Sequence, residues 1–348
     1  MRKTVAALAL IPVTMTAIPI FRNDAWWVRI FDFPRVQIAL ILLAFLIALL
    51  AMRPKFNSFP GFAATLVGLA LIGQAIEIGP FTPLWPNQMT EAKGGQPTLK
   101  LLTANVLMDN READDLHAYI ESQDADLILL TEPDAWWEDQ MRRHEAEYPH
   151  VLRRPLDNTY GMLLYSRLPL IEPNVREMFE EDVPSFHFFV DVGGQRVRMH
   201  LIHPKPPFPK ESDDTTDRDA EIVLVGKMVR DESGPAIVMG DFNDVAWSYS
   251  TGLFQEISGL MDPRLGRGFY HTFHADYFFA RWPLDYVFAT DHFRLVSLER
   301  LGGVGSDHFP LVAELELAPA PDPDNADPEA DADELKQADE VIDKGGEK

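Results

Sequence analysis

The sequence of 348 residues contains no cysteine. This absence excludes disulfide frameworks, thiolate zinc sites, thioether-linked haem and cysteine nucleophiles. It leaves the compartment open, because a chain without cysteine suits an oxidising space without requiring one. Basic residues are scarce: 31 Lys and Arg stand against 54 Asp and Glu, and the formal net charge is −23. Hydrophobic residues at 46% are ordinary for a globular protein, so the whole is neither disordered nor collagen-like.

The charge is unevenly distributed along the chain. Residues 1–87 hold seven Lys/Arg and three Asp/Glu, a net charge of +4, whereas residues 318–348 hold three Lys and eleven Asp/Glu, a net charge of −8. Residues 88–317 therefore carry −19. A body of that charge repels a polyanion at long range, which counts against a protein that slides along DNA. It is compatible with a site that recruits divalent cations.

Residues 1–87 are expected to form a membrane anchor that binds the lipid bilayer. A spanning helix needs about 20 apolar residues, with about 17 near the lower limit. Trp26 and Trp27 lie where interfacial aromatic residues are typical. We expect three spans, or two if the last run is re-entrant or interfacial; a cleaved signal peptide or buried core helices are the alternatives. The uncharged runs are Thr4–Ile20, Val36–Met52 and the shorter Phe62–Ile76.

The far end of the chain has a different composition. Residues 318–348 are dominated by Pro, Ala, Asp and Glu and contain no aromatic residue. Such a segment buries too little apolar area to offset its ordering entropy, so we expect a disordered acidic tail. Residues 88–98 are expected to link the anchor to a catalytic domain at 99–317.

The pattern within 99–317 alternates strands with helices. Apolar runs at Leu99–Val106 and Asp126–Thr131 predict buried strands, and the spacing over Thr215–Arg230 predicts a helix. Gly193 and Gly194 separate two apolar runs, which is a strong hairpin signal. This mixture of hairpins and helices favours a layered α/β sandwich over a purely parallel sheet.

Polar residues follow the ends of several apolar strands. Strand ends are where sites gather, because the sheet fixes direction and the loop gives access. A single Asn or Asp there is usually a turn former, but five coincident positions favour a site. Oxygen donors without cysteine suit Mg²⁺ or Mn²⁺ better than zinc, and the histidines could contact or protonate a phosphate. The residues are Asn105, Glu132, His203, Asp241 with Asn243, and Asp307 with His308.

Together these residues predict metal-assisted attack of water on a phosphate ester. The segments LLTANVL, LILLTEPD, LIHP, IVMGDFND, PLDYVFAT and GSDHFPL, in this order, resemble the endonuclease/exonuclease/phosphatase superfamily. The resemblance covers about residues 99–317 and implies a four-layer α/β sandwich, in which two packed mixed sheets are flanked by helices. The HPKPP run at His203–Pro207 is similar to the membrane-anchored bacterial branch. That likeness implies a multi-pass protein of the cell inner membrane with a periplasmic catalytic domain.

The resemblance also implies roles for individual residues. Asn105 and Glu132 match the first metal-site positions, and Asp307 matches a metal-associated Asp. Asp241 matches the acid that binds near the metal and positions or deprotonates the attacking water, and its partner Asn243 steadies the phosphorane oxygens.

Three further residues match the phosphate side of the family's site. His203 matches the His that hydrogen-bonds the scissile phosphate, although the supporting acid has no clear match; Asp157 is a weak candidate and is more typical of a turn. His308 matches the active-site His, and Asp285 matches the acid that orients it. An Asp–His pair makes physical sense because the carboxylate fixes the tautomer and stabilises the imidazolium. Whether Asp241 or His308 is the general base stays open.

The expected function is that of a membrane-tethered, Mg²⁺-dependent, nuclease-like phosphodiesterase, with Mn²⁺ as a possible substitute. One alternative is a phosphodiesterase of phospholipid, sphingomyelin or inositol phosphate, which the anchor and the missing basic groove favour. The other is a non-catalytic scaffold with the same fold.

Overall fold

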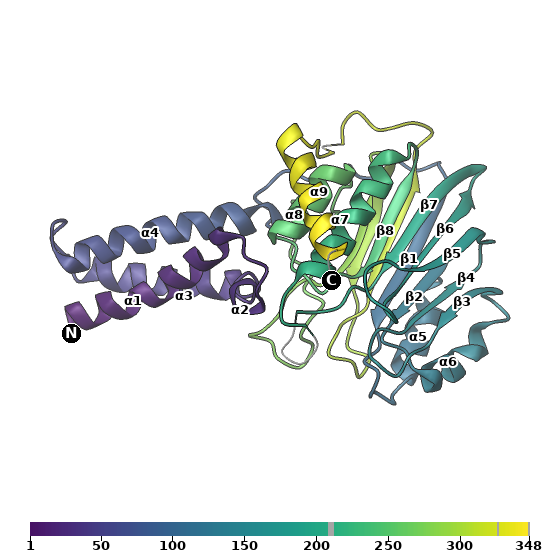
Figure 1. Cartoon of the computed structure of the whole chain (residues 1–348), viewed down its shortest axis with the longest axis horizontal. Helices are drawn as coiled ribbons and strands as arrows, with labels where there is room; N and C mark the ends of the chain where they lie inside the picture. The colour runs from purple at the N-terminus through teal and green to yellow at the C-terminus, as the bar shows by residue number, and fades with distance from the viewer. Residues whose placement is uncertain (208–211, 326, 347–348) are drawn as a thin grey trace.

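A computed structural model describes residues 1–207, 212–325 and 327–346. The chain consists of an N-terminal helical segment (residues 2–81) that projects from a layered α/β domain (Figure 1). The elements of the helical segment are α1 (Arg2–Ala17), η1 (Ile18–Phe21), α2 (Trp26–Arg29), α3 (Arg35–Ala51), α4 (Phe59–Ile78) and η2 (Gly79–Phe81).

Among the described residues, two helices are long and apolar enough to cross a membrane: Arg2–Phe21 and Phe59–Phe81. The helix between them, Arg35–Ala51, is apolar but has only 17 residues. At 1.5 Å per residue it is about 26 Å long, short of the roughly 30 Å hydrocarbon core. By length, the described residues therefore offer two candidate spans instead of the expected three. The run that looked weakest in sequence is the longest, because the helix continues past Glu77.

Two sheets form the body of the domain. The first has the strand order β10-β11-β1-β2-β4-β3 and the second has the order β5-β6-β7-β8-β9. Both are mixed, because β1 pairs with β2 and β7 with β8 in parallel whereas the other pairs are antiparallel. The first sheet consists of β1 (Thr98–Asn105), β2 (Leu127–Thr131), β3 (His150–Arg154), β4 (Met162–Ser166), β10 (Phe293–Arg300) and β11 (Leu311–Leu317). The second consists of β5 (Ile171–Glu177), β6 (Pro184–Val192), β7 (Gln195–Ile202), β8 (Ala236–Asp241) and β9 (Asp285–Ala289).

The sheets pack face to face with helices outside both. Apolar residues of the two inner faces, such as Leu129 and Met199, form the central core. Helices α5 (Asp114–Gln123) and α6 (Ala135–Met141), with η3 (Arg142–His144), lie on the outer face of the first sheet. Helices α7 (Thr216–Asp231) and α8 (Tyr249–Ser258) cover the second. The predicted α/β sandwich of two mixed sheets flanked by helices is confirmed.

The acidic tail differs from the expected disorder. Residues Ala332–Gly346 form α9, which packs against α7 (Figure 1). Ala338 is buried in a cluster with Val223, Leu253 and Ile257. Composition predicts disorder because the tail is polar on average. Its few apolar residues nevertheless recur at helical spacing, so they gather on one face that α7 and α8 cover.

The helical segment docks on the domain through the turn between α1 and α3, which comprises residues 18–34 and includes η1 and α2. The backbone N–H of Trp26 donates to the carbonyl of Asp213 over 3.3 Å, and that of Thr215 donates to Asp24 over 2.8 Å. The indole N–H of Trp247 donates to the carbonyl of Asp32 over 2.7 Å. The end of the helical bundle is thereby fixed against the domain beside the loops that follow β7 and β8.

Candidate active site

The candidate site lies where strands of both sheets end. β1 and β2 run in parallel, so Asn105, the last residue of β1, and Glu132, which follows β2, meet at the same edge. β7 and β8 are also parallel, so His203, which follows β7, and Asp241, the last residue of β8, meet at one edge of the second sheet. β9 is antiparallel to β8 and begins with Asp285 directly opposite Asp241. The packing of the two sheets then brings both edges together.

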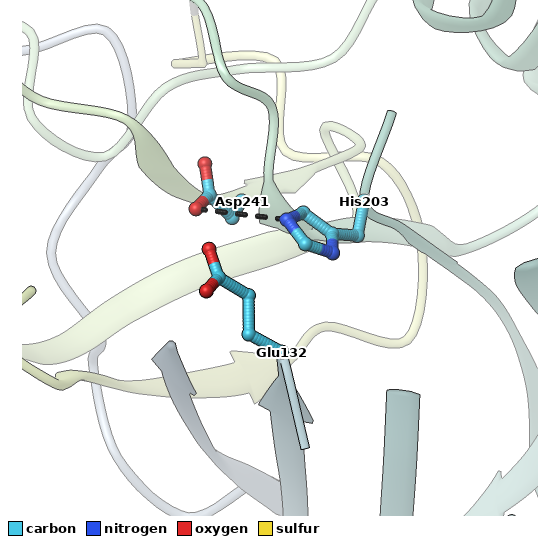
Figure 2. Close-up of side chains that lie close together, drawn as sticks. All are labelled: Glu132, His203 and Asp241. Atoms are coloured by element: carbon cyan, nitrogen blue, oxygen red, sulfur yellow. Dashed lines mark ion pairs between the residues drawn. The ribbon is translucent and has the colours of Figure 1, made fainter. Parts of the chain in front are cut away.

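Asn105 joins the acidic residues of the two sheets. Its side-chain amide donates to Glu132 Oε1 over 2.7 Å and to Asp241 Oδ2 over 3.0 Å. Figure 2 shows the carboxylates of Glu132 and Asp241 turned toward one another with the His203 ring beside them. The Oδ1 atom of Asn105 accepts the N–H of Leu107 over 3.0 Å, so in this arrangement the amide holds the acids in place.

Burial shapes the protonation of the two acids. Burial raises the pKa of Glu132 to about 7, against the opposing effects of the Asn105 hydrogen bond and of His308. Burial also raises the pKa of Asp241, which is fully buried. Both pKa values rise because burial out of water disfavours the charged form of each carboxylate. A cation bound between the two carboxylates would stabilise their charged forms.

His308 and Asp285 form a buried pair. His308 Nδ1 lies 2.8 Å from Asp285 Oδ2, and His308 Nε2 lies 3.6 Å from Asp241 Oδ2. Burial alone lowers the pKa of His308, but the carboxylates of Asp285 and Asp241 outweigh it and raise the pKa to about 10. The two carboxylates therefore favour the charged form of the imidazole beside Asp241, and Asp285 fixes its orientation.

His203 is buried without a hydrogen bond. Its Nε2 lies 4.0 Å from Asp241 Oδ2, and within the described residues neither ring nitrogen has a hydrogen-bond partner. Burial lowers the pKa of this imidazole to about 4. Asp157 lies exposed in the β3–β4 loop, so it does not supply the missing carboxylate. An orphaned polar ring next to two acids is a fit for a bound phosphate or metal.

Asn243 is fixed by hydrogen bonds of both its backbone and its side chain. It has a left-handed φ of +51°, its N–H donates to Asp241 Oδ1 over 2.9 Å, and its amide donates to the Pro204 carbonyl over 3.0 Å. The Asn243 carbonyl accepts from Arg218 Nη1 over 2.8 Å. Arg218 is buried between Asp219 and Asp244, so it supports the loop and does not face solvent.

The structure groups the expected metal-ligating residues unequally. Among the described residues, ligand atoms of Glu132, His203 and Asp241 lie within 4.8 Å of one another, as do those of Asp241, Asp285 and His308. Asp307 belongs to neither group, although it lines the same cavity as Glu132 and His308. The donor set fits a divalent cation, because hard carboxylate oxygens predominate.

Sequence reasoning missed two kinds of supporting residue. Thr272 is buried, and its hydroxyl accepts the N–H groups of Leu284 and Asp285 over 3.1 Å each, which fixes the start of β9. Arg218 and Asp244 brace Asn243 from behind. Thr272 lies in a loop with no periodic signal, but the second Asp of GDFND was a visible clue to Asp244.

Comparisons with known proteins agree with this arrangement. The Endonuclease/Exonuclease/phosphatase family matches residues 102–308. A search of curated protein sequences finds no significant match. The fold is similar to an endonuclease/exonuclease/phosphatase from Beutenbergia cavernae, with 20% identity, a TM-score of 0.50, and 64% of this chain and 72% of that chain covered. The human Nocturnin catalytic domain with bound sulfate aligns at 15% identity and a TM-score of 0.51, covering 64% of this chain and 96% of that chain.

A third similar structure is D. rerio TDP2 complexed with a single strand DNA product, at 17% identity and a TM-score of 0.50, covering 63% of this chain and 99% of that chain. At these identities the structures establish the fold alone. The family match extends over more than half of the chain and includes the strand ends that hold the acidic residues. The protein therefore belongs to the endonuclease/exonuclease/phosphatase family, as a hydrolase that acts on phosphoester bonds.

Proposed function

We propose that the protein is a Mg²⁺-dependent phosphodiesterase that cleaves its substrate by attack of water. The observation that carries the proposal is the convergence on Asp241, which lies within 4.0 Å of Asn105, His203 and His308 side-chain nitrogens. Buried acids and histidines that shift one another's pKa are typical of catalytic sites. Mn²⁺ has the same ligand preferences and is expected to substitute for Mg²⁺.

The roles follow from the contacts. Glu132 and Asp241, with Asn105 and Asp307 nearby, would hold the cation, which when bound supplies Lewis-acid polarisation of a phosphate oxygen. Asp241 is placed to position the attacking water. His203 and the imidazolium of His308 are placed to donate to phosphate oxygens, and Asn243 is beside them. Asp285 fixes the orientation of the His308 ring through their 2.8 Å contact.

We also propose that the helical segment tethers the protein to the inner membrane. Ala6, Ala9 and Ala63 are buried between the helices together with larger residues such as Leu42, whereas other large apolar residues such as Leu40 are exposed. Small residues at helix contacts and large apolar residues on the outer face are expected for helices packed in lipid. The likeness to the anchored bacterial branch supports a periplasmic domain. A reporter enzyme fused after residue 346 tests the periplasmic location of the domain. A reporter that is active only in the cytoplasm contradicts that location.

Nucleic acid is one candidate substrate, favoured by the single strand DNA product held by D. rerio TDP2. The net charge of −19 over residues 88–317 opposes long-range attraction of a polyanion. The phosphodiester reaction does not depend on this choice.

The reaction is tested with the full chain in detergent and bis(p-nitrophenyl) phosphate as a soluble diester. We expect Mg²⁺-dependent release of nitrophenol that Asp241→Asn reduces by at least a hundredfold. Asp139→Asn removes a carboxylate whose side chain is 68% exposed and serves as the matched control. Equal activity of the two variants contradicts the site assignment.

A further inference from the structure

A cavity of about 600 Å³ adjoins the acidic centre. Glu132, Asn243 and His308 line one part of it, and most of the remaining wall is apolar. Trp26 and Ile30, which belong to the turn between α1 and α3, form part of that wall. The helical segment thus contributes directly to the space next to the reacting groups.

Aromatic rings connect this turn with the catalytic histidine. Phe33 meets Trp282 edge to face with ring centroids 5.7 Å apart, and Trp282 stacks on Phe273 at 5.7 Å. Phe273 in turn lies 5.0 Å from the imidazole of His308. The apolar wall is therefore continuous from the helical segment to the centre of the site, as a long apolar group bound beside a phosphate requires.

The rim of the cavity is also apolar. We define the aromatic lip as Tyr277, Phe278 and Phe279, whose side chains are exposed by 52%, 81% and 63%. Gln37 Nε2, in the first turn of α3, donates to the Phe279 carbonyl over 3.0 Å. The lip therefore lies beside the domain-proximal end of α3, which is at the level of the membrane surface when the bundle is embedded. Exposed aromatic residues at that level are typical of contact with lipid.

We propose that the substrate is a phospholipid of the leaflet next to the domain. Its phosphodiester binds at the acidic centre, its apolar part occupies the cavity, and the aromatic lip contacts the bilayer. This proposal rests on the phosphodiesterase function above and specifies its substrate class.

Charge favours a lipid over a nucleic acid. Among the described residues that line the cavity, none is Lys or Arg. Arg281, near its edge, donates to the carbonyls of His274 and Ala275 and lies over the Phe309 ring. A nucleic acid needs cations along its backbone, whereas a zwitterionic lipid needs a single phosphate site and apolar surface.

The reaction is a hydrolysis and balances with water alone. The water oxygen forms a bond to phosphorus, one ester P–O bond breaks, and the proton released by the water goes to the leaving oxygen. The products are an alcohol and a phosphomonoester.

The test uses the full chain in mixed micelles of phosphatidylethanolamine and a non-ionic detergent with Mg²⁺, and measures the phosphomonoester or alcohol released. In parallel, each protein is assayed on bis(p-nitrophenyl) phosphate. The double variant Phe278→Ser with Phe279→Ser alters only the lip, and Ile30→Ser alters the anchor side of the cavity. The matched control is Val296→Ser, an exposed apolar side chain on β10. Circular dichroism confirms that each variant is folded.

We expect hydrolysis of the lipid by the wild-type protein, a reduction of at least tenfold in the lip variant, and a similar reduction in Ile30→Ser. The lip variant keeps its rate on the soluble diester within twofold, and Val296→Ser keeps both rates. Hydrolysis of the soluble diester without hydrolysis of the lipid overturns the lipid proposal and leaves the phosphodiesterase intact. Inactivity on both substrates overturns both. Faster hydrolysis of a single-stranded oligonucleotide than of the lipid assigns the aromatic wall to bases and overturns the proposal.

Discussion

Replacing Arg29 with methionine is expected to destabilise the protein by about 3–5 kcal/mol. Arg29 belongs to α2, yet only 3% of its side chain is exposed, because it inserts into the domain. Its guanidinium lies 3.2 Å from Asp32, 3.9 Å from Asp244 and 4.0 Å from Asp219, and it donates to Ser250 over 3.0 Å.

The magnitude follows from the composition of this cluster. Arg29, Arg35 and Arg218 neutralise Asp32, Asp219 and Asp244, and all six side chains are buried. Arg29→Met preserves most of the volume but leaves one buried negative charge without compensation. Removing one partner of a buried ion pair costs about 3–5 kcal/mol, which for a domain of this size lowers the melting temperature by about 6–20 °C. The cluster braces the Asn243 loop through Arg218, so the hydrolysis rate should fall as well.

Thermal and urea unfolding of the full chain in detergent measures the effect. The matched control is Arg143→Met, whose partner Glu121 is 3.7 Å away with both side chains more than half exposed. Such a surface pair contributes less than about 1 kcal/mol. Adding Asp32→Asn to Arg29→Met removes the excess charge and should recover part of the loss. If Arg29→Met is no less stable than Arg143→Met, the reasoning from buried charge is refuted.

Three other changes test other parts of the structure. His308→Gln should lower the hydrolysis rate of the soluble diester by about 10²–10⁴-fold, and an unchanged rate would remove His308 from the mechanism. The melting temperature should fall as well, because Asp285 loses its buried partner at 2.8 Å. Burial lowers the pKa of His187 to about 4 and that of His200 to about 3, so below the unfolded value of about 6.5 the unfolded chain binds more protons. The contribution of these two histidines to stability should therefore be full above about pH 6.5 and fall by a few kcal/mol toward pH 4, and His200→Gln should flatten that part of the profile in urea titrations. Truncation after residue 330 should lower the melting temperature, because α9 covers Val223 and Leu253; no change would mean that the tail adds nothing to the fold.

Local sequence patterns predict much of the fold. The Gly193-Gly194 turn predicts the β6–β7 hairpin, and both residues have the positive φ, +63° and +88°, that glycine adopts without strain. The apolar run at Asp126–Thr131 predicts β2, and helical spacing predicts α7 within one residue at each end. The strands β3, β5 and β10 are partly exposed and mixed in polarity, so they gave no alternating signal.

The candidate site likewise contains residues that local sequence patterns predict and residues that only the folded structure reveals. Polar residues that follow apolar strands are visible along the chain, and this pattern predicts Glu132, Asp241 and His308, whose side chains the structure brings close to one another. The structure places Asp307 outside the close groups of ligands, because the direction of a side chain after a turn depends on the packed loop. The roles of Arg218 and Thr272 depend on partners more than ten residues away, and no local pattern records such contacts.

The sequence by itself determined the chemistry available to this protein: oxygen and imidazole ligands without cysteine, an apolar N-terminal segment, and strands that end in polar residues. These properties are local, because they depend on residue type and on spacing within one element. Only the tertiary structure decided that the segment after the first apolar helix forms a wall of the cavity beside the acidic centre, and that Arg29 is buried against Asp244. Both result from packing elements that lie some 200 residues apart in the chain, where burial and charge pairing, rather than periodicity, fix the contacts.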